Sequence, residues 1–194
     1  MNISAIVLCG GRSSRMGRNK AILPFKGETS TDRVVRLVRE VTTDIVLVGR
    51  RDPGVLTDCP VIGDPGEGPL VALAIGLGAT SALRTLVVAC DMPLVRPALL
   101  AHLVERIGEH DACVPRTAGT AVPTCAVYAR GATEVARSLV AAGDRSLRAL
   151  LDRVSVQWVE EPELREVDPD LRSFIDCDTP EDYARALRIA GLGR

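Results

Sequence analysis

The sequence predicts an α/β fold in which one doubly wound, mostly parallel sheet carries helices on both faces. Short runs rich in Val, Ile and Leu alternate along the chain with segments of helical periodicity, which is the order that builds βαβ units. The apolar runs are nearly continuous, as in Leu86–Ala89, and this is typical of strands covered on both faces. No stretch has the composition of a linker, so we expect residues 1–194 to form a single domain.

Each element follows from a local pattern. Apolar, β-branched runs predict strands at Ile3–Leu8, Asp44–Val48, Pro60–Ile62, Leu86–Ala89, Ala112–Val114, Val122–Tyr128, Val154–Val159 and Phe174–Cys177. Apolar residues at helical spacing predict helices at Thr31–Val41, Leu70–Ala79, Pro97–Ile107, Ala132–Ala142, Leu147–Arg153 and Pro180–Ala190. The last helix has the clearest start, because Thr179 can act as its N-cap and Pro180 suits the first helical position. The acidic segment Glu160–Asp170 is expected to be a solvated connection.

Composition excludes several classes of partner. The net charge of −1 gives no general attraction to nucleic acid or to an anionic membrane. Aromatic residues make up only 3% of the chain, which disfavours a protein that stacks single-stranded bases. The six cysteines and two histidines lack zinc-site spacing, so we interpret the cysteines as reduced core residues. No signal peptide and no membrane-length apolar segment is recognisable, and we therefore expect a cytoplasmic protein.

A glycine-rich, cationic loop follows the first predicted strand. The strand ends at Leu8, Gly10 and Gly11 come next, and a basic segment containing Lys20 continues without an acid until Glu28. Glycines let main-chain amides approach a ligand, and consecutive amides cradle anions. The loop therefore predicts a polyphosphate site; a basic surface turn is the alternative. Neither the Walker A spacing nor the G-x-G-x-x-G fingerprint is present, which disfavours a dehydrogenase.

Carboxylates follow two other predicted strands. Asp91 comes two residues after the most apolar strand, and Asp176 and Asp178 alternate at the end of the last one. Ligands of open α/β sheets bind beyond the carboxyl ends of strands, and Asp oxygens are good ligands for Mg²⁺. We therefore expect Asp91, with Asp176 or Asp178, to hold Mg²⁺ beside the phosphates; capping of turns and helices is the alternative role. The loop Gly63–Leu70 is glycine-rich enough to approach a base or a ribose.

These four elements, in this order, resemble the molybdenum cofactor guanylyltransferase family over nearly the whole chain. Leu8–Lys20 matches the family's opening motif, which is roughly L-A-G-G-x-S-x-R-M-G-x-D-K. Gly68–Leu70 matches its G-P-L motif, Cys90–Pro93 its C-D-x-P motif, and Asp176–Glu181 its N-x-N-T-P-E motif. Val127-Tyr128 and Ala142–Leu147 resemble its middle segments. Three positions depart from the pattern. Asn19 stands where the family usually has Asp, and Asp176 and Asp178 stand where guanylyltransferases usually have Asn. Those two aspartates are more similar to the related cytidylyltransferases.

The resemblance implies a Rossmann-like nucleotidyltransferase that moves GMP from GTP to the terminal phosphate of molybdopterin or molybdenum cofactor and releases pyrophosphate. Mg²⁺ would be held by Asp91 and Asp176, and Arg15, Lys20 and Asp91 would be catalytic. Nucleotide contacts would come from Leu8, Cys9, Gly10, Gly11, Lys20, Gly49, Asp64, Gly68 and Asp91, and pterin contacts, as weaker candidates, from Arg116, Arg145 and Ser146. The product would pass to molybdopterin-handling proteins or molybdoenzyme chaperones.

Two further readings stay open at this point. One is a cytidylyltransferase, or another nucleotidyltransferase acting on a phosphorylated metabolite. The other is a non-catalytic adaptor that binds the nucleotide or the pterin without transferring anything. The departure from the family pattern at Asn19 is consistent with an adaptor, whereas the presence of Lys20 and Asp91 disfavours one.

Overall fold

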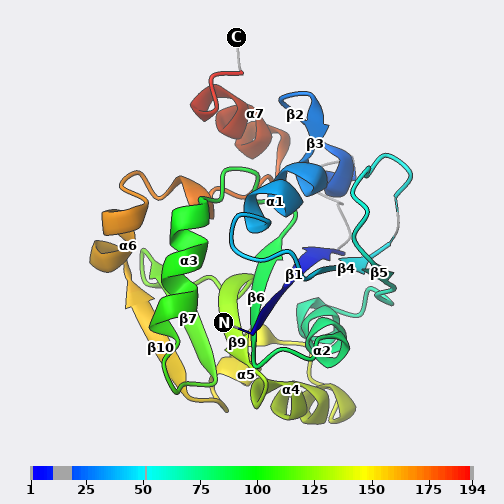
Figure 1. The fold of residues 1–194 in the computed structure, drawn as a ribbon, viewed down its shortest axis with the longest axis vertical. Coiled ribbons are helices and arrows are strands. Elements are labelled where there is room, and N and C mark those ends of the chain that lie inside the picture. Colours follow the sequence, from blue (N-terminus) through cyan, green and yellow to red (C-terminus); the bar gives the residue numbers. More distant parts are fainter. Residues whose placement is uncertain (1, 11–18, 51, 193–194) are drawn as a thin grey trace.

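The protein is described from a computed structural model, which covers residues 2–10, 19–50 and 52–192 (Figure 1). Its centre is an eight-stranded sheet in the order β10-β7-β9-β6-β1-β4-β5, with β8 paired to β7. The strands are β1 (Ile3–Cys9), β4 (Ile45–Gly49), β5 (Val61–Ile62), β6 (Arg84–Ala89), β7 (Ala112–Thr117), β8 (Thr120–Ala121), β9 (Cys125–Ala129) and β10 (Val156–Glu160). Strand β9 runs antiparallel to its neighbours β6 and β7, and β8 runs antiparallel to β7. The other pairs in this sheet are parallel, which confirms the mostly parallel sheet.

Helices cover both faces of the sheet, as the sequence predicted (Figure 1). One face packs against α1 (Ser30–Val38), α3 (Pro97–Arg106) and α6 (Glu161–Val167), and the other against α2 (Pro69–Ala79), α4 (Ala132–Ala141) and α5 (Leu147–Leu151). Neighbouring strand residues face opposite layers, so Val7 packs toward α1 while Ile6 packs toward α2. Among the described residues, no helix is long and apolar enough to cross a membrane.

A third, smaller apolar cluster lies at one end of the molecule. It joins a short hairpin, β2 (Pro24–Phe25) and β3 (Glu28–Thr29), to the last helix, α7 (Pro180–Ile189). Leu23 and Phe25 are buried there with Cys177 and Ala186, and the hydroxyl of Tyr183 donates to the carbonyl of Pro24. The hairpin directly follows the 3₁₀ helix η1 (Lys20–Ile22), so this cluster places the segment after the glycine loop beside the C-terminal part of the chain.

Two predictions for the C-terminal third were wrong. The expected strand Phe174–Cys177 is instead the end of a 3₁₀ helix, η2 (Arg172–Phe174), followed by irregular backbone. The main-chain N–H of Cys177 donates to the carbonyl of Asp91 at 2.9 Å rather than to a strand ladder. The segment Glu160–Asp170 is not a mere solvated connection, because it forms α6 and buries Leu164. Leu164 packs in the apolar cluster that includes α3, so the acidic composition of the segment did not prevent it from forming a helix on the core.

Helix α7 begins with a complete capping box. Thr179 accepts from the N–H of Asp182 at 3.1 Å, and Asp182 accepts from the N–H of Thr179 at 3.1 Å.

We expect Thr179→Ala to lower the free energy of unfolding by about 1 kcal/mol, because the main-chain N–H of Asp182 loses its hydrogen-bond acceptor. Urea unfolding measures this. Ser138→Ala on the exposed side of α4 is the control and should change stability little; an equal loss in both variants would contradict the assignment.

Candidate functional site

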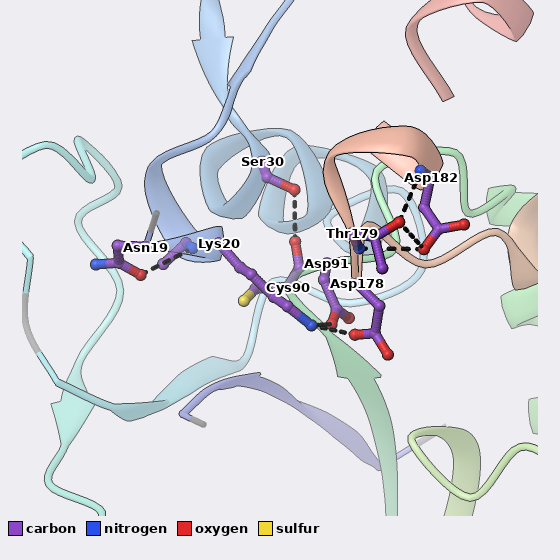
Figure 2. A network of polar contacts seen from close by, with 9 residues as sticks. Asn19, Lys20, Ser30, Cys90, Asp91, Asp178, Thr179 and Asp182 are labelled. Atoms are coloured by element: carbon purple, nitrogen blue, oxygen red, sulfur yellow. Dashed lines mark hydrogen bonds and ion pairs between the residues drawn. The ribbon is translucent and has the colours of Figure 1, made fainter. Parts of the chain in front are cut away.

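The carboxyl ends of the central strands carry a lysine between two carboxylates. Lys20 begins η1, and its Nζ lies 3.1 Å from Oδ2 of Asp91, the second residue after β6. Lys20 also donates to Asp178, which directly precedes the N-cap of α7 (Figure 2). The side chains of Lys20 and Asp91 are each about one fifth exposed, at 20% and 19%. The structure therefore brings together three residues from distant parts of the chain in a half-buried, water-accessible position.

This ion pair keeps Lys20 charged. Burial by itself lowers the pKa of the Lys20 ammonium, but the hydrogen bonds and negative charges of Asp178 and Asp91 outweigh burial, and the pKa is raised. Lys20 is therefore a permanent cation at physiological pH. A fixed ammonium at this place can bind a phosphate oxygen as a point charge.

The first turn of α1 holds both sides of this ion pair in place. The hydroxyl of Ser30 donates to the carbonyl of Cys90 at 2.6 Å (Figure 2), and the hydroxyl of Thr31 donates to the carbonyl of Ala21 at 2.8 Å. Both hydroxyl residues are buried, where an unpaired polar group is costly. Sequence reasoning missed this bracing role. The available signal is the run of Thr and Ser residues from Thr29 to Thr31 at the start of the predicted helix.

Asp176 adds a further carboxylate to the same neighbourhood. The residue as a whole is exposed, yet partial desolvation of its carboxyl, and then the negative charges of Asp178 and Asp91, raise the pKa of Asp176. The expected alternation of Asp176 and Asp178 along a strand is wrong, because no strand forms there. The negative charges of Asp178 and Asp91 nevertheless act on the Asp176 carboxyl. Together with Lys20, which pairs with Asp91 and Asp178, these residues carry more negative than positive charge.

Surplus carboxylate charge is the donor chemistry that suits a hard divalent cation. Within the described parts of the chain, no group of three or more His, Cys, Asp or Glu residues forms a ready metal cage. Mg²⁺ does not require one, because it is usually bound through one or two carboxylates together with substrate phosphates and water. Asp91 and Asp176 fit this open type of site, in which the substrate completes the coordination.

Asp176→Asn tests the carboxylate crowding. An acid with a raised pKa in the folded state destabilises the fold above that pKa and has no effect below its unfolded pKa, about 3.8. We therefore expect Asp176→Asn to raise the melting temperature at pH 7 without divalent ions, and this gain to vanish as the pH falls below about 3.8. Asp44→Asn, at an exposed position just before β4, is the matched control for the loss of one carboxylate. A constant gain at both pH values would contradict the assignment.

The start of the glycine loop lies beside this ion pair. Leu8 is buried, and its carbonyl accepts from the N–H of Cys90 at 3.0 Å. Cys9 is partly exposed and Gly10 is exposed, so main chain at the end of β1 faces the solvent-accessible edge. Gly49 is buried against the backbone of Cys9 and Gly10. Gly11 and Arg15 lie outside the described residues.

The loop before α2 reaches the same edge. A Cβ built on Gly10 would lie 2.4 Å from Oδ2 of Asp64, so the carboxyl of Asp64 covers the start of the glycine loop. Gly68 is the N-cap of α2 and lies close to the side chain of Arg145. If Gly68 carried a Cβ, that atom would lie 3.2 Å from the Cβ of Arg145. Ser146 follows as the N-cap of α5. The structure thus groups these four residues on the side of the sheet that carries α2.

Arg116 is not part of this group. It lies near the end of β7, stacks over the ring of Trp158 at 4.0 Å from the guanidinium carbon to the centroid, and pairs with Glu160 at 2.7 Å. Strand β9 lies between β7 and the strand β6 that leads to Asp91. Any contact of Arg116 with a ligand would therefore be on the far side of the site from the glycine loop.

Asn19, the position that departs from the family pattern, has a local structural role. Its Oδ1 accepts from the N–H of Ala21 at 3.1 Å and caps η1, and its Nδ2 donates to Asp52 at 2.6 Å. An amide can make both bonds at once, because it carries an acceptor and a donor. An aspartate could not donate to Asp52, so Asn19 is matched to this chain's own loop after β4.

Comparisons with known proteins bear on the family and the fold of the chain. Residues 5–160 match the family described as MobA-like NTP transferase domain. A molybdenum cofactor guanylyltransferase of Desulfosudis oleivorans is 32% identical, over 99% of this chain and 98% of the relative. A relative from Pelotomaculum thermopropionicum, named a probable molybdenum cofactor guanylyltransferase, is 30% identical over 100% and 96%. The solved structure of molybdopterin-guanine dinucleotide biosynthesis protein A from Archaeoglobus fulgidus superposes with a TM-score of 0.83 at 27% identity, covering 97% of this chain and 98% of that one.

Proposed function

Because the chain belongs to the MobA-like NTP transferase family, we propose that it transfers GMP from GTP to the terminal phosphate of molybdopterin or molybdenum cofactor and releases pyrophosphate. The observation that carries this proposal is the 3.1 Å contact between Lys20 and Asp91 at the carboxyl end of the central strands. The contact supports the proposal because an ammonium can bind phosphate, a carboxylate can bind a metal, and both lie beyond the carboxyl ends of the strands, where open α/β sheets bind ligands.

Lys20 and Arg15 act on the phosphate tail. The attacking phosphate oxygen is already anionic, so the reaction needs no general base, and the difficulty lies in bringing two anions together. Lys20 turns from Asp91 to bind the β- and γ-phosphates while it stays paired with Asp178, and Arg15 is assigned to the same oxygens by its place in the opening motif. Both then stabilise the leaving pyrophosphate.

Asp91 and Asp176 hold Mg²⁺ in this proposal. When bound, Mg²⁺ neutralises charge on the α-phosphate and orients it for in-line attack. Burial, and then the charges of Asp178 and Asp91, raise the pKa of Asp176, and a carboxylate in that setting supports the choice of Asp176 as the second ligand. Asp178 is then left to orient Lys20, with which it is paired.

The nucleotide lies across the end of β1. Main-chain amides of Leu8, Cys9, Gly10 and Gly11 hold the phosphates, and Gly49 supports that backbone from β4. Asp64 and Gly68 border the guanosine, since the carboxyl of Asp64 covers Gly10. The pterin enters from the side of Arg145 and Ser146, with Arg116 as an outer contact.

The whole chain from residue 1 to residue 194 acts as one nucleotidyltransferase domain in this proposal. The family match ends at residue 160, yet Asp178 comes later and pairs with Lys20 in the first half of the chain. The enzyme works in the cytoplasm, where GTP is available. It hands its product to molybdopterin-handling proteins or molybdoenzyme chaperones, and it needs no nucleic acid or membrane.

The test is a screen of the four nucleoside triphosphates with Mg²⁺ and molybdopterin. We expect pyrophosphate and a pterin–guanine dinucleotide with GTP only. Turnover with CTP instead would identify a cytidylyltransferase, the reading that Asp176 and Asp178 favour. Binding of GTP, seen as a rise in melting temperature, without turnover on either pterin form would identify a non-catalytic adaptor.

A further inference from the structure

Two cysteines meet at the junction between the glycine loop and the strand that leads to Asp91. Cys9 is the last residue of β1, and Cys90 directly follows β6. The two strands are parallel neighbours in which Leu8 is paired with Ala89, and the N–H of Cys90 donates to the carbonyl of Leu8 at 3.0 Å. Cys9 and Cys90 are therefore the next residues along the same pairing. Adjacent strands lie about 4.8 Å apart, within the Cα separation that a disulfide spans.

Both thiols point to the same face of the sheet. Cys90 belongs to the apolar cluster under α1, and Cys9 packs against that cluster. The Sγ of Cys9 lies 3.9 Å from Oγ1 of Thr31 in the first turn of α1, on the side of the sheet where Cys90 is buried. Cys9 and Cys90 thus lie side by side on one face, at the ends of paired strands.

The two thiols differ in access. Cys9 is partly exposed at the solvent-accessible edge, whereas Cys90 is only 5% exposed. Burial raises the pKa of Cys113, Cys125 and Cys177 to about 12, so those thiols stay protonated and unreactive. The family motif has Ala at the position of Cys9, so this neighbouring pair is a feature of this chain and not of the shared site.

We propose that Cys9 and Cys90 form an oxidisable dithiol site whose reactant is a peroxide. The Cys9 thiolate attacks one peroxide oxygen, the O–O bond breaks, and the departing hydroxide takes up a proton as water. Cys90 sulfur then attacks the sulfur of the Cys9 sulfenic acid; the S–O bond breaks, and its hydroxide leaves with the Cys90 proton as a second water. Two thiols lose two electrons in total, and hydrogen peroxide is reduced to two waters.

The disulfide connects the loop start to the strand end that carries Asp91. It fixes the main chain of Cys9, which we propose binds the nucleotide, against a residue adjacent to Asp91. Misplacement of positioned groups by about 1 Å can cost about 100-fold in rate. A nucleotide bound at the end of β1 covers Cys9 and shields it from peroxide.

The experiment treats the reduced, full-length protein with hydrogen peroxide, blocks the remaining thiols and maps peptides by mass spectrometry. We expect a peptide that links Cys9 to Cys90, reversed by dithiothreitol. Cys9→Ala, which restores the family residue, and Cys90→Ser should both lack it. Cys59→Ala removes another buried thiol and should form the link as the wild type does. Loss of the Cys9 thiol without any Cys9–Cys90 link would overturn the proposal.

Two further measurements distinguish a failure of the dithiol proposal from a failure of the proposed function. They are the turnover rate after oxidation and the rate at which the Cys9–Cys90 link forms with Mg²⁺·GTP bound. Wild-type turnover should fall about 100-fold on oxidation and recover on reduction, while Cys9→Ala should keep most of its own starting rate. Mg²⁺·GTP at about ten times its dissociation constant should slow formation of the link about tenfold. A link that forms equally fast with and without Mg²⁺·GTP would support the dithiol site and count against nucleotide binding at the end of β1. If oxidation inactivated Cys9→Ala as fully as the wild type, the claim that the Cys9–Cys90 disulfide causes the loss of turnover would be contradicted.

Discussion

Asp91→Asn is expected to lower turnover at least about 100-fold while the fold stays intact, which is the size of loss seen when one preorganised electrostatic contact to a transition state is removed. The substitution keeps the size of the side chain and the carbonyl bond from Cys177, but it removes one negative charge from the place where Lys20 and the proposed Mg²⁺ meet. The free energy of unfolding should change little, because Lys20 keeps its contact with Asp178.

Single-turnover kinetics with GTP and the pterin measure this loss, and urea unfolding checks the fold. Asp152→Asn, an exposed acid just after α5, is the matched control and should keep wild-type turnover. Because the metal contact is proposed mainly for the transition state, we expect kcat to fall more than KM rises. Turnover of Asp91→Asn at the wild-type rate would remove Asp91 from the mechanism.

Gly49→Ala is expected to have the largest effect on the fold near the site. A Cβ at this position would lie 2.7 Å from the carbonyl carbon of Cys9, 2.8 Å from its oxygen and 2.9 Å from the nitrogen of Gly10. All three atoms are backbone, so no flexible side chain can move aside. The φ of +152° adds a conformation that residues with a side chain rarely adopt. We expect a loss of about 3 kcal/mol in the free energy of unfolding, from overpacking and backbone strain together.

The same substitution should weaken nucleotide binding, because the displaced atoms begin the proposed phosphate loop. Urea unfolding gives the stability loss, and the rise in melting temperature with Mg²⁺·GTP gives the change in binding. Gly63→Ala is the control for stability, since a Cβ there meets no atom within 4 Å and the free energy of unfolding should stay near that of the wild type. A Gly49→Ala protein with unchanged stability would show that the end of β1 can shift without cost.

The site was partly predictable because its components follow strand ends. Asp91, Gly10 and Asp64 each come just after an apolar run, and in a parallel sheet such positions gather at one edge.

The prediction of a strand at Phe174–Cys177 was wrong because the apolar residues there have another role. Apolar content there reflects packing of irregular backbone against the core and against α7, and periodicity alone does not distinguish this from a short strand.

The sequence by itself determined the alternation of strands and helices, the faces they bury and the place of the glycine loop, because hydrophobic periodicity and turn chemistry act over a few residues. Only the tertiary structure decided that Lys20 lies between Asp91 and Asp178, which are 71 and 158 residues away along the chain. Strand order and the packing of β2–β3 on α7 set those contacts. The adjacency of Cys9 and Cys90 is also tertiary, since the register of β1 against β6 brings the two thiols together.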